Sequence, residues 1–384
     1  MRLIRNARLY TMEGPGLLEG GDVLIDSGKI AAVGVNLSAS GAREIDARGA
    51  YVTPGFIDPH SHIGLWADGE RDETGDGNEM TDPVTPQMRA LDAVNPVDPC
   101  FAEACRAGVT TVATGPGSAN VLGGQFLAMK TFGGSLKAML VKEPLAMKAA
   151  FGENPKMVYG SGGKRPSTRM ATAAVLREAF YEARAYMEKR ACADADKRPD
   201  FNLKNEALAM VLRRELPLKM HAHRADDILT AIRLAEEFNL RASVEHCTEG
   251  YLIADELRKA NVGVILGPLL TDRGKPELKN LTMKAPAILY RAGVKFALMT
   301  DHGVIPEPYL PVEAGLCVRE GLPEMEAMRA ITIHAAGVLG LEERLGSLAP
   351  GKDADVVLFD GHPLETRTHA SLVIVNGNIA YERA

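Results

Sequence analysis

Thr53-Pro54-Gly55-Phe56-Ile57-Asp58-Pro59-His60-Ser61-His62 is the stretch that decides how this chain folds. An apolar run ends here in two histidines one residue apart. Residues i and i+2 of a strand point to the same face, so both imidazoles can converge on one ion. Two histidines near a strand end are often only hydrogen-bonded surface groups. The interpretation therefore depends on further potential ligands elsewhere in the chain.

Further potential ligands close later apolar runs. His221 follows Pro217-Leu-Lys-Met, His246 follows Ala242-Ser-Val-Glu, and Asp301 follows Phe296-Ala-Leu-Met-Thr. Each of the three opens a loop. Catalytic groups lie at this place when parallel strands form a (β/α)8 barrel, because the loops at the carboxyl ends of the strands build the site. The sequence therefore predicts an α/β protein with a (β/α)8 TIM barrel.

Helical and strand-like segments alternate over most of the chain. Helix-like spacing covers residues 98–106, 171–192, 226–238 and 251–259, and strand-like runs cover 108–113, 242–244 and 262–266. This alternation favours a parallel barrel over an open sheet. We expect residues 53–347 to form the barrel.

Both ends of the chain consist of short strand-like runs broken by turns. Residues 1–52 contain the turn Asp26-Ser-Gly28, and residues 348–384 contain Asn376-Gly377, which is a hairpin signal. Neither end is long enough to bury a core alone, but the two ends paired together would do so. We expect a small β-sandwich domain formed from residues 1–52 and 348–384.

The composition excludes several classes of partner. Hydrophobic residues make up 46% and charged residues 24% of the 384, and the net charge of -6 argues against nucleic acid or an anionic membrane as the main partner. No run reaches the roughly 18 apolar residues of a transmembrane helix. Five cysteines without a Cys-x-x-Cys pair argue against a disulfide framework and favour the reducing cytoplasm. We expect a small-molecule substrate and leave open whether the chain forms a homo-oligomer.

The candidate ligands suit a hydrolytic metal. Neutral imidazole and carboxylate bind zinc, and also iron, nickel or manganese. Such a metal needs three to five protein ligands, lowers the pKa of a water and polarises a carbonyl. His60, His62, His221, His246 and Asp301 supply that many groups. Asp301 has a second use, since a carboxylate beside the metal can accept the proton of the water and deliver it to the leaving nitrogen.

Together these motifs resemble the amidohydrolase superfamily, and the resemblance covers almost the whole chain. It rests on Pro54-Gly-Phe-Ile-Asp-Pro-His-Ser-His62, on the later histidines and Asp301, and on the closing Gly346-Ser-Leu-Ala-Pro-Gly-Lys-Asp-Ala-Asp355-Val-Val. The resemblance implies that His60, His62 and Asp301 hold the more buried metal. It also implies that His221 and His246 are the ligands from strands five and six. The closer similarity is to imidazolonepropionase-like amidohydrolases and their peptidase relatives.

The resemblance further implies one or two zinc ions, the second bridged by a carboxylated lysine. A lysine reacts with carbon dioxide only as the free amine, which requires a low pKa. We expect Lys148 to be this ligand, because its sequence neighbours are apolar and it precedes a loop. Lys142 and Glu143 are the alternatives, and an ordinary structural role for Lys148 also stays open.

Four more residues are predicted at the substrate pocket because they lie beside presumed ligands or in adjoining loops: Gln125, His223, Arg224 and His302. His223 shares a strand face with His221 and is the alternative metal ligand of that pair. Arg224 either clamps a substrate carboxylate with two hydrogen bonds or is a solvent-exposed residue at a helix start.

The leading hypothesis is hydrolysis of an amide or cyclic amide C–N bond in a small molecule by a metal-activated water. Deamination of a nitrogen heterocycle is the first alternative. By resemblance, deaminases of the superfamily carry a glutamate three residues after the strand-five histidine, and Arg224 stands there after His221. This difference favours amide hydrolysis. The alternative from another class is a non-catalytic barrel scaffold, against which the intact ligand set argues.

Overall fold

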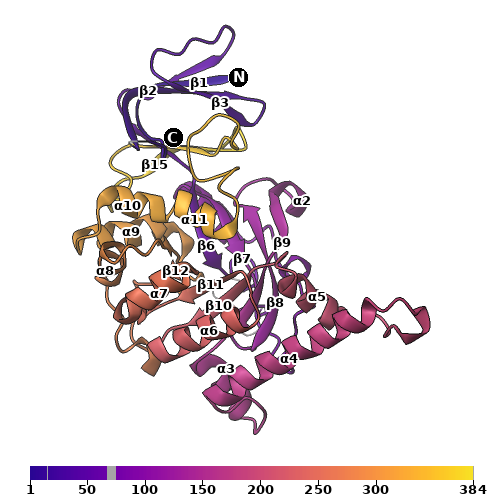
Figure 1. Cartoon of the computed structure of the whole chain (residues 1–384). Helices are drawn as coiled ribbons and strands as arrows, with labels where there is room; N and C mark the ends of the chain where they lie inside the picture. Colours follow the sequence, from indigo (N-terminus) through magenta and orange to yellow (C-terminus); the bar gives the residue numbers. More distant parts are fainter. Residues whose placement is uncertain (15, 67–74, 384) are drawn as a thin grey trace.

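Both ends of the chain contribute strands to one eight-stranded sheet, seen at the top of Figure 1. The computed structural model describes residues 1–14, 16–66 and 75–383. The order is β16-β15-β14-β5-β1-β2-β3, with β4 paired to β1. The strands are β1 (Arg2–Tyr10), β2 (Leu17–Asp26), β3 (Lys29–Gly34), β4 (Arg43–Asp46), β5 (Tyr51–Pro54), β14 (Val356–Phe359), β15 (Ala370–Val375) and β16 (Asn378–Glu382).

The two ends meet where β5 pairs antiparallel with β14, and Val52 lies opposite Leu358. Ile4, Val23 and Ile374 belong to one buried apolar cluster drawn from both ends. Each end therefore covers apolar side chains that the other would leave in water. The sandwich form of this domain and the boundaries at residues 52 and 348 stay predictions.

The turn between β15 and β16 contains the predicted Asn376-Gly377 pair. Both residues have positive φ, 47° and 76°, as two-residue hairpin turns of this kind require. A side chain at position 377 would also meet the backbone of Gly28, since an added Cβ would lie 2.8 Å from its Cα. Glycine is therefore needed there for conformation and for space.

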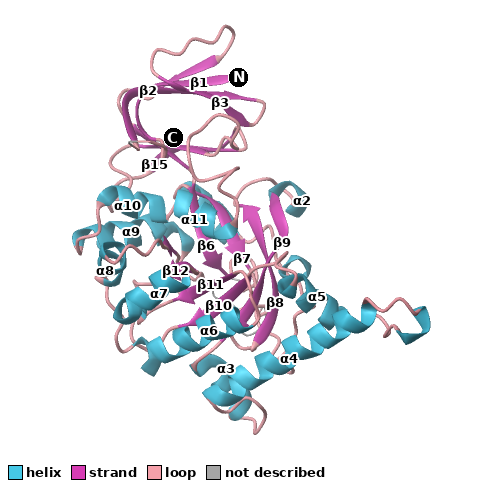
Figure 2. Cartoon of the chain, viewed as in Figure 1, coloured by secondary structure: helices cyan, strands magenta, loops and turns pink. Residues whose placement is uncertain are grey.

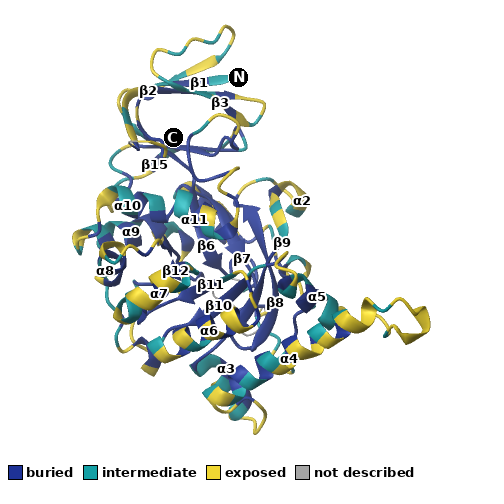
Figure 3. Ribbon diagram, in the orientation of Figure 1, coloured by how far each residue is buried: buried dark blue, intermediate teal, exposed yellow. Residues whose placement is uncertain are grey.

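The second eight-stranded sheet has the order β13-β12-β11-β10-β9-β8-β7-β6 and forms the barrel. Its strands are β6 (Phe56–Ser61), β7 (Val109–Thr114), β8 (Leu122–Lys130), β9 (Leu140–Ala150), β10 (Leu218–Ala222), β11 (Ala242–His246), β12 (Gly263–Leu266) and β13 (Ala297–Leu298). Most of their residues are buried, except at the start of β9, whereas many residues of the surrounding helices are exposed (Figure 3).

The predicted (β/α)8 repeat is wrong at one strand. β8 pairs antiparallel with both β7 and β9, whereas the other strand pairs in this sheet are parallel. Gln125 was predicted to lie in a loop that adjoins the site, but residues from Leu122 onward belong to β8. Gly124 has φ of 119°, and an added Cβ would lie 2.6 Å from the Met88 carbonyl oxygen. The glycine thus permits close backbone contact within a strand.

Hydrogen bonds beyond the strand ladder nearly close the barrel. The backbone N–H and the hydroxyl of Thr300 donate to Asp58 Oδ2 at 2.8 and 2.7 Å. The backbone N–H of His62 donates to the His302 carbonyl oxygen at 2.7 Å. These bonds join the segment after β13 to β6 and the residue that follows it.

Helices surround the barrel, as Figure 2 shows. In α6, Ile228, Ala231, Ile232 and Ala235 are buried, at the spacing of three and four residues that places them on one helix face. The helices are α1 (Pro99–Arg106), α2 (Leu136–Met139), α3 (Glu153–Gly160), α4 (Arg169–Arg190), α5 (Leu203–Leu212), α6 (Ala225–Glu237), α7 (Ala254–Ala260), α8 (Ala285–Arg291), α9 (Leu310–Arg319), α10 (Glu324–Ala330) and α11 (Ile333–Leu339). Within the described ranges, no helix has both the length and the apolar character needed to cross a membrane.

Candidate metal centre

Two clusters of potential metal ligands lie at the carboxyl ends of barrel strands. The first cluster contains His60, His62 and Asp301, and the second contains His221, His223 and His246. Within each cluster the candidate ligand atoms lie within 4.8 Å of one another, and every one of these residues is buried. The structure thus brings together all the histidines and the aspartate that the sequence indicated as ligands.

The first cluster has distances that suit a shared ion. Asp301 Oδ1 lies 3.4 Å from His60 Nε2 and 3.2 Å from His62 Nε2. Metal–ligand bonds of about 2.1 Å at tetrahedral angles separate ligand atoms by about 3.4 Å. Burial would raise the pKa of Asp301, but the neighbouring imidazoles outweigh it and hold that pKa well below its ordinary value. Asp301 is therefore anionic at neutral pH, which is the form that a metal ligand requires.

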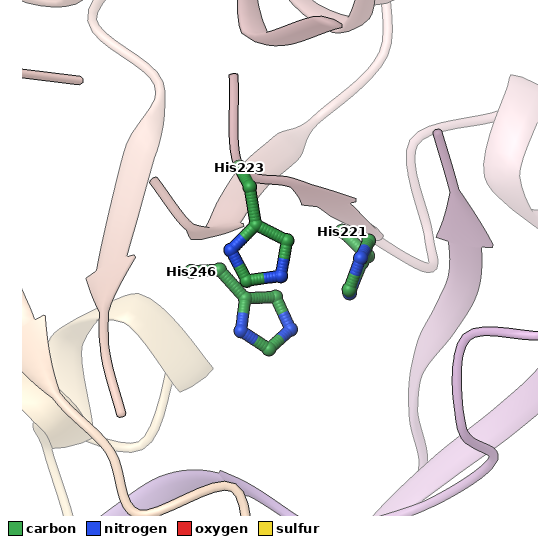
Figure 4. A group of neighbouring side chains, drawn as sticks. All are labelled: His221, His223 and His246. Carbon is green, nitrogen blue, oxygen red and sulfur yellow. The ribbon is translucent and has the colours of Figure 1, made fainter. Parts of the chain in front are cut away.

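The three imidazoles of the second cluster lie close together, as Figure 4 shows. Each ring is held through Nδ1 by another part of the chain. The contacts are His221 Nδ1 with Ser118 Oγ at 2.8 Å, His223 Nδ1 with Thr248 Oγ1 at 2.8 Å, and His246 Nδ1 with the Gly267 carbonyl oxygen at 3.0 Å. These contacts leave Nε2 as the candidate ligand atom of each ring.

Burial keeps the second cluster neutral. It lowers the pKa of His223 to about 3 and holds the pKa values of His221 and His246 well below their ordinary value. Neutral imidazole is the form that binds metals. His221 Nε2, His246 Nε2 and Asp301 Oδ1 are buried and have no hydrogen-bond partner among the described residues. Buried polar atoms without partners are costly, and a metal ion would satisfy them.

A buried carboxylate that the sequence analysis missed supports His60. Glu245 contacts His60 Nδ1, and its Oε1 lies 2.7 Å from Lys219 Nζ. Carboxylates commonly orient metal-binding histidines in this way. The available signal was a glutamate inside the short apolar run before His246, where a charge is expensive unless it is paired.

Lys148 lies beside the first cluster. It is fully buried in β9, and its Nζ is 3.4 Å from His60 Nε2. Burial lowers the pKa of Lys148 to about 8, which increases the fraction of free amine that carboxylation needs. The alternatives lie elsewhere: Lys142 is exposed, and Glu143 pairs with Arg89 at 2.7 Å. Carboxylation of Lys148 stays a prediction.

A cavity of about 590 Å³ opens over both clusters. His62, Asp301 and the three histidines of the second cluster form part of its wall. Trp66, Ser118 and Lys275 also line it, so the cavity presents an aromatic face, a hydroxyl and a cation near the ligands. Its volume suits a small molecule.

The structure does not bring three of the predicted pocket residues into the lining of this cavity. Gln125 donates through Nε2 to the Pro86 carbonyl oxygen at 3.1 Å. Arg224 makes two hydrogen bonds to the neighbouring Asp226, at 2.9 and 3.0 Å. His302 accepts through Nδ1 from the Glu307 N–H at 3.2 Å. His223 is the predicted pocket residue that does line the cavity.

The comparisons with known proteins extend over both sheets. Residues 51–381 match the family described as Amidohydrolase family. An amidohydrolase of known crystal structure from Thermotoga maritima MSB8 is 44% identical, with a TM-score of 0.96 and 100% of both chains covered. Amidohydrolase tasK of Hapsidospora irregularis is 29% identical over 99% of this chain, which spans 43% of the length of that relative. Imidazolonepropionase of Maricaulis maris (strain MCS10) is 28% identical, with 94% of this chain and 92% of the relative covered.

Proposed function

We propose that this chain cleaves an amide or cyclic amide of a small molecule in a metal-dependent reaction. The proposal starts from the family: the chain belongs to the amidohydrolase family and is a hydrolase of carbon–nitrogen bonds. The observation that carries the proposal is the convergence of five histidines and Asp301 on one cavity wall or directly behind it. Buried, neutral imidazoles such as those of His221 and His246, whose Nε2 atoms have no hydrogen-bond partner among the described residues, suit zinc. One or two ions per chain fit the two clusters.

A divalent metal held by these residues would polarise the substrate carbonyl and lower the pKa of a water. The residues of the chain supply the rest of the chemistry. Asp301 lines the cavity and carries a negative charge, so it can accept a proton and return it to the leaving nitrogen. Glu245 and Lys219 hold His60 in place from behind. The cavity confines the substrate next to Asp301.

The position of Arg224 supports amide hydrolysis over deamination. By resemblance, deaminases carry a glutamate at this place. Here the arginine pairs with Asp226, and neither residue is in the wall of the cavity. The two buried ligand clusters also support catalysis over a scaffold role, because a scaffold has no need to bury neutral imidazoles around one cavity. The cytoplasmic location and the state of assembly stay predictions.

The test uses metal-free protein reloaded separately with zinc, manganese, nickel or iron. Each form is assayed against dipeptides, N-acyl amino acids, hydantoins and lactams, with nitrogen heterocycles assayed in parallel for ammonia release. We expect metal-dependent cleavage of an amide or cyclic amide, with no such activity in His60→Ala and unchanged activity in His369→Ala, whose side chain is exposed. Cleavage that survives metal removal, or ammonia release alone, would overturn the proposal.

A further inference from the structure

Glu277 presents a buried carboxylate to the second histidine cluster. It lies in a short 3-10 turn, Pro276–Leu278, in the loop between β12 and α8, and its side chain is 1% exposed. Its Oε1 is 3.6 Å from His223 Nε2 and 4.0 Å from His221 Nε2. The carboxylate thus stands at ligand–ligand distances from two of the three imidazoles.

The other oxygen of Glu277 is fixed by the backbone. Oε2 accepts a hydrogen bond from the N–H of Glu153, the first residue of α3, at 3.1 Å. Gly152 makes room for this contact, because a Cβ there would lie 2.9 Å from Oε2. Oε1 is buried and accepts no hydrogen bond from the described residues. The carboxylate is therefore anchored by one oxygen while the other faces the histidines.

The protein supplies little positive charge to balance Glu277. Lys275 favours the charged form, but its side chain is exposed. Asp227, on the other side of Gly152, adds a negative charge, and Arg169 is bound to Asp227 at 2.9 Å. Neutral imidazoles cannot supply the missing positive charge, whereas a metal ion can.

We propose that Glu277 and His223 complete, with His221 and His246, a metal cage of three imidazoles and one carboxylate. Four protein ligands fill a tetrahedral zinc site, for which ligand atoms are separated by about 3.4 Å. The His223–Glu277 distance of 3.6 Å and the His221–Glu277 distance of 4.0 Å need only small adjustments. Glu277 lies outside the group of ligand atoms within 4.8 Å of one another that His246 belongs to, so the carboxylate has to move towards His246 when the metal binds. The inference rests on the proposed function only for the role that the metal plays. Binding of the metal can be measured without any turnover of substrate.

This cage assigns different tasks to the two clusters. Four-ligand zinc sites are closed and structural, whereas catalytic sites keep one position open. His60, His62 and Asp301 provide three ligands, so the open position belongs to that cluster. The cage would also hold its metal without a carboxylated Lys148, so binding of the second ion would not require carboxylation of this lysine.

The test is a zinc titration of the metal-free full chain against a chromophoric chelator. We expect two zinc sites in the wild type. In Glu277→Gln, one site should weaken at least tenfold while the other keeps its affinity, and His223→Ala should weaken the same site. Asp272→Asn is the matched control, because Asp272 lies in the same loop and the cavity wall but is exposed. It should bind both ions like the wild type.

Cobalt spectra give a second readout of the same cage. Cobalt loaded into the second site should change its visible absorption in Glu277→Gln, and Glu277→Asp should serve if the glutamine variant does not fold. Wild-type affinity for both zinc ions in a folded Glu277→Gln or Glu277→Asp variant would overturn the inference. If the two-site titration behaves as expected but no amide is cleaved, the proposed function fails and the cage stands.

Discussion

Glu245→Gln removes the charge behind His60 while nearly keeping the shape of the side chain. Glu245 is fully buried, and its Oε1 lies 2.7 Å from Lys219 Nζ and accepts from Ser243 Oγ at 2.9 Å. Lys219 is also buried and otherwise donates to the Pro59 carbonyl oxygen at 3.0 Å. The substitution would leave the lysine ammonium group buried without its counter-charge.

Removing one partner of a buried ion pair typically costs about 3–5 kcal/mol. Because glutamine still offers an oxygen to Lys219, we expect the free energy of unfolding at pH 7 to fall by about 3 kcal/mol. Burial would raise the pKa of Glu245, but Lys219 and His60 outweigh it and lower that pKa from 4.5. The carboxylate therefore stabilises the fold above about pH 4.5, and this contribution is lost as the pH falls toward the folded pKa. In Glu245→Gln, the free energy of unfolding should therefore lack the decrease that this carboxylate causes below about pH 4.5.

The measurement is urea unfolding of the metal-free protein, followed by circular dichroism and by the fluorescence of Trp66, the single tryptophan. The two transitions must coincide to yield one free energy. Glu143→Gln is the control, because Glu143 pairs with a partly exposed arginine and should lose about 0–1 kcal/mol. A loss in Glu245→Gln no larger than in this control would refute the reasoning. Zinc affinity of the first cluster should also fall by about 10–100-fold.

Three other changes test separate parts of the molecule. Asp301→Asn keeps an oxygen ligand but cannot accept a proton, so kcat should fall by about 10²–10⁴-fold while metal analysis still finds zinc; turnover within a few-fold of the wild type would assign the proton transfer elsewhere. Lys148→Met should stabilise the metal-free protein at pH 7 by up to about 3 kcal/mol, because burial lowers the pKa of Lys148 from 10.5 to about 8. The unfolded chain then binds more protons, so the wild type should gain stability as the pH rises from 8 to 10.5, and an equal gain in the variant would contradict this account. Deleting residues 350–384 removes β14, β15 and β16 and should yield insoluble protein; a folded, active truncation would contradict the shared sheet.

The sequence predicted correctly those helices that are specified by local features, such as the spacing of apolar residues and a capping side chain. The apolar positions of residues 226–238 gave α6, and Asp98 caps α1 by accepting from the Cys100 N–H at 2.9 Å. The strand-end histidines were found because strand ends of a barrel meet at one face. β8 was missed because its glycines resemble a loop, and only the close approach of Met88 shows why a strand needs them.

The features of the site that the sequence could not decide depend on tertiary burial and on local hydrogen bonds. Glu277 follows the polar run Asp272-Arg-Gly-Lys-Pro276, which reads as a solvated loop, and only the contact with Glu153 reveals that it turns inward. The sequence left Arg224 open between a substrate clamp and an exposed residue at a helix start, and in the structure it pairs with Asp226 outside the cavity wall. Lys142 and Lys148 are six residues apart, so strand alternation gives them the same face and cannot separate them. The two lysines differ in burial, because the first half of β9 is near the surface and its second half is buried. This difference follows from the fold and is not visible in the local sequence.

The candidate ligands are held in place by residues in, or directly after, strands other than their own, and this links barrel closure to the geometry of the candidate metal centre. His62, after β6, is fixed through Nδ1 by the Gly115 carbonyl oxygen after β7, at 2.7 Å. His246 of β11 is fixed by the Gly267 carbonyl oxygen after β12, at 3.0 Å. His60 of β6 is supported by Glu245 of β11, across the barrel order. Because each ring orientation depends on the register of another strand, a shift of one strand would misplace a ligand on another. The register of the sheet therefore accounts for the preorganisation of the site, and the loops of the cavity wall are left to determine which substrate enters.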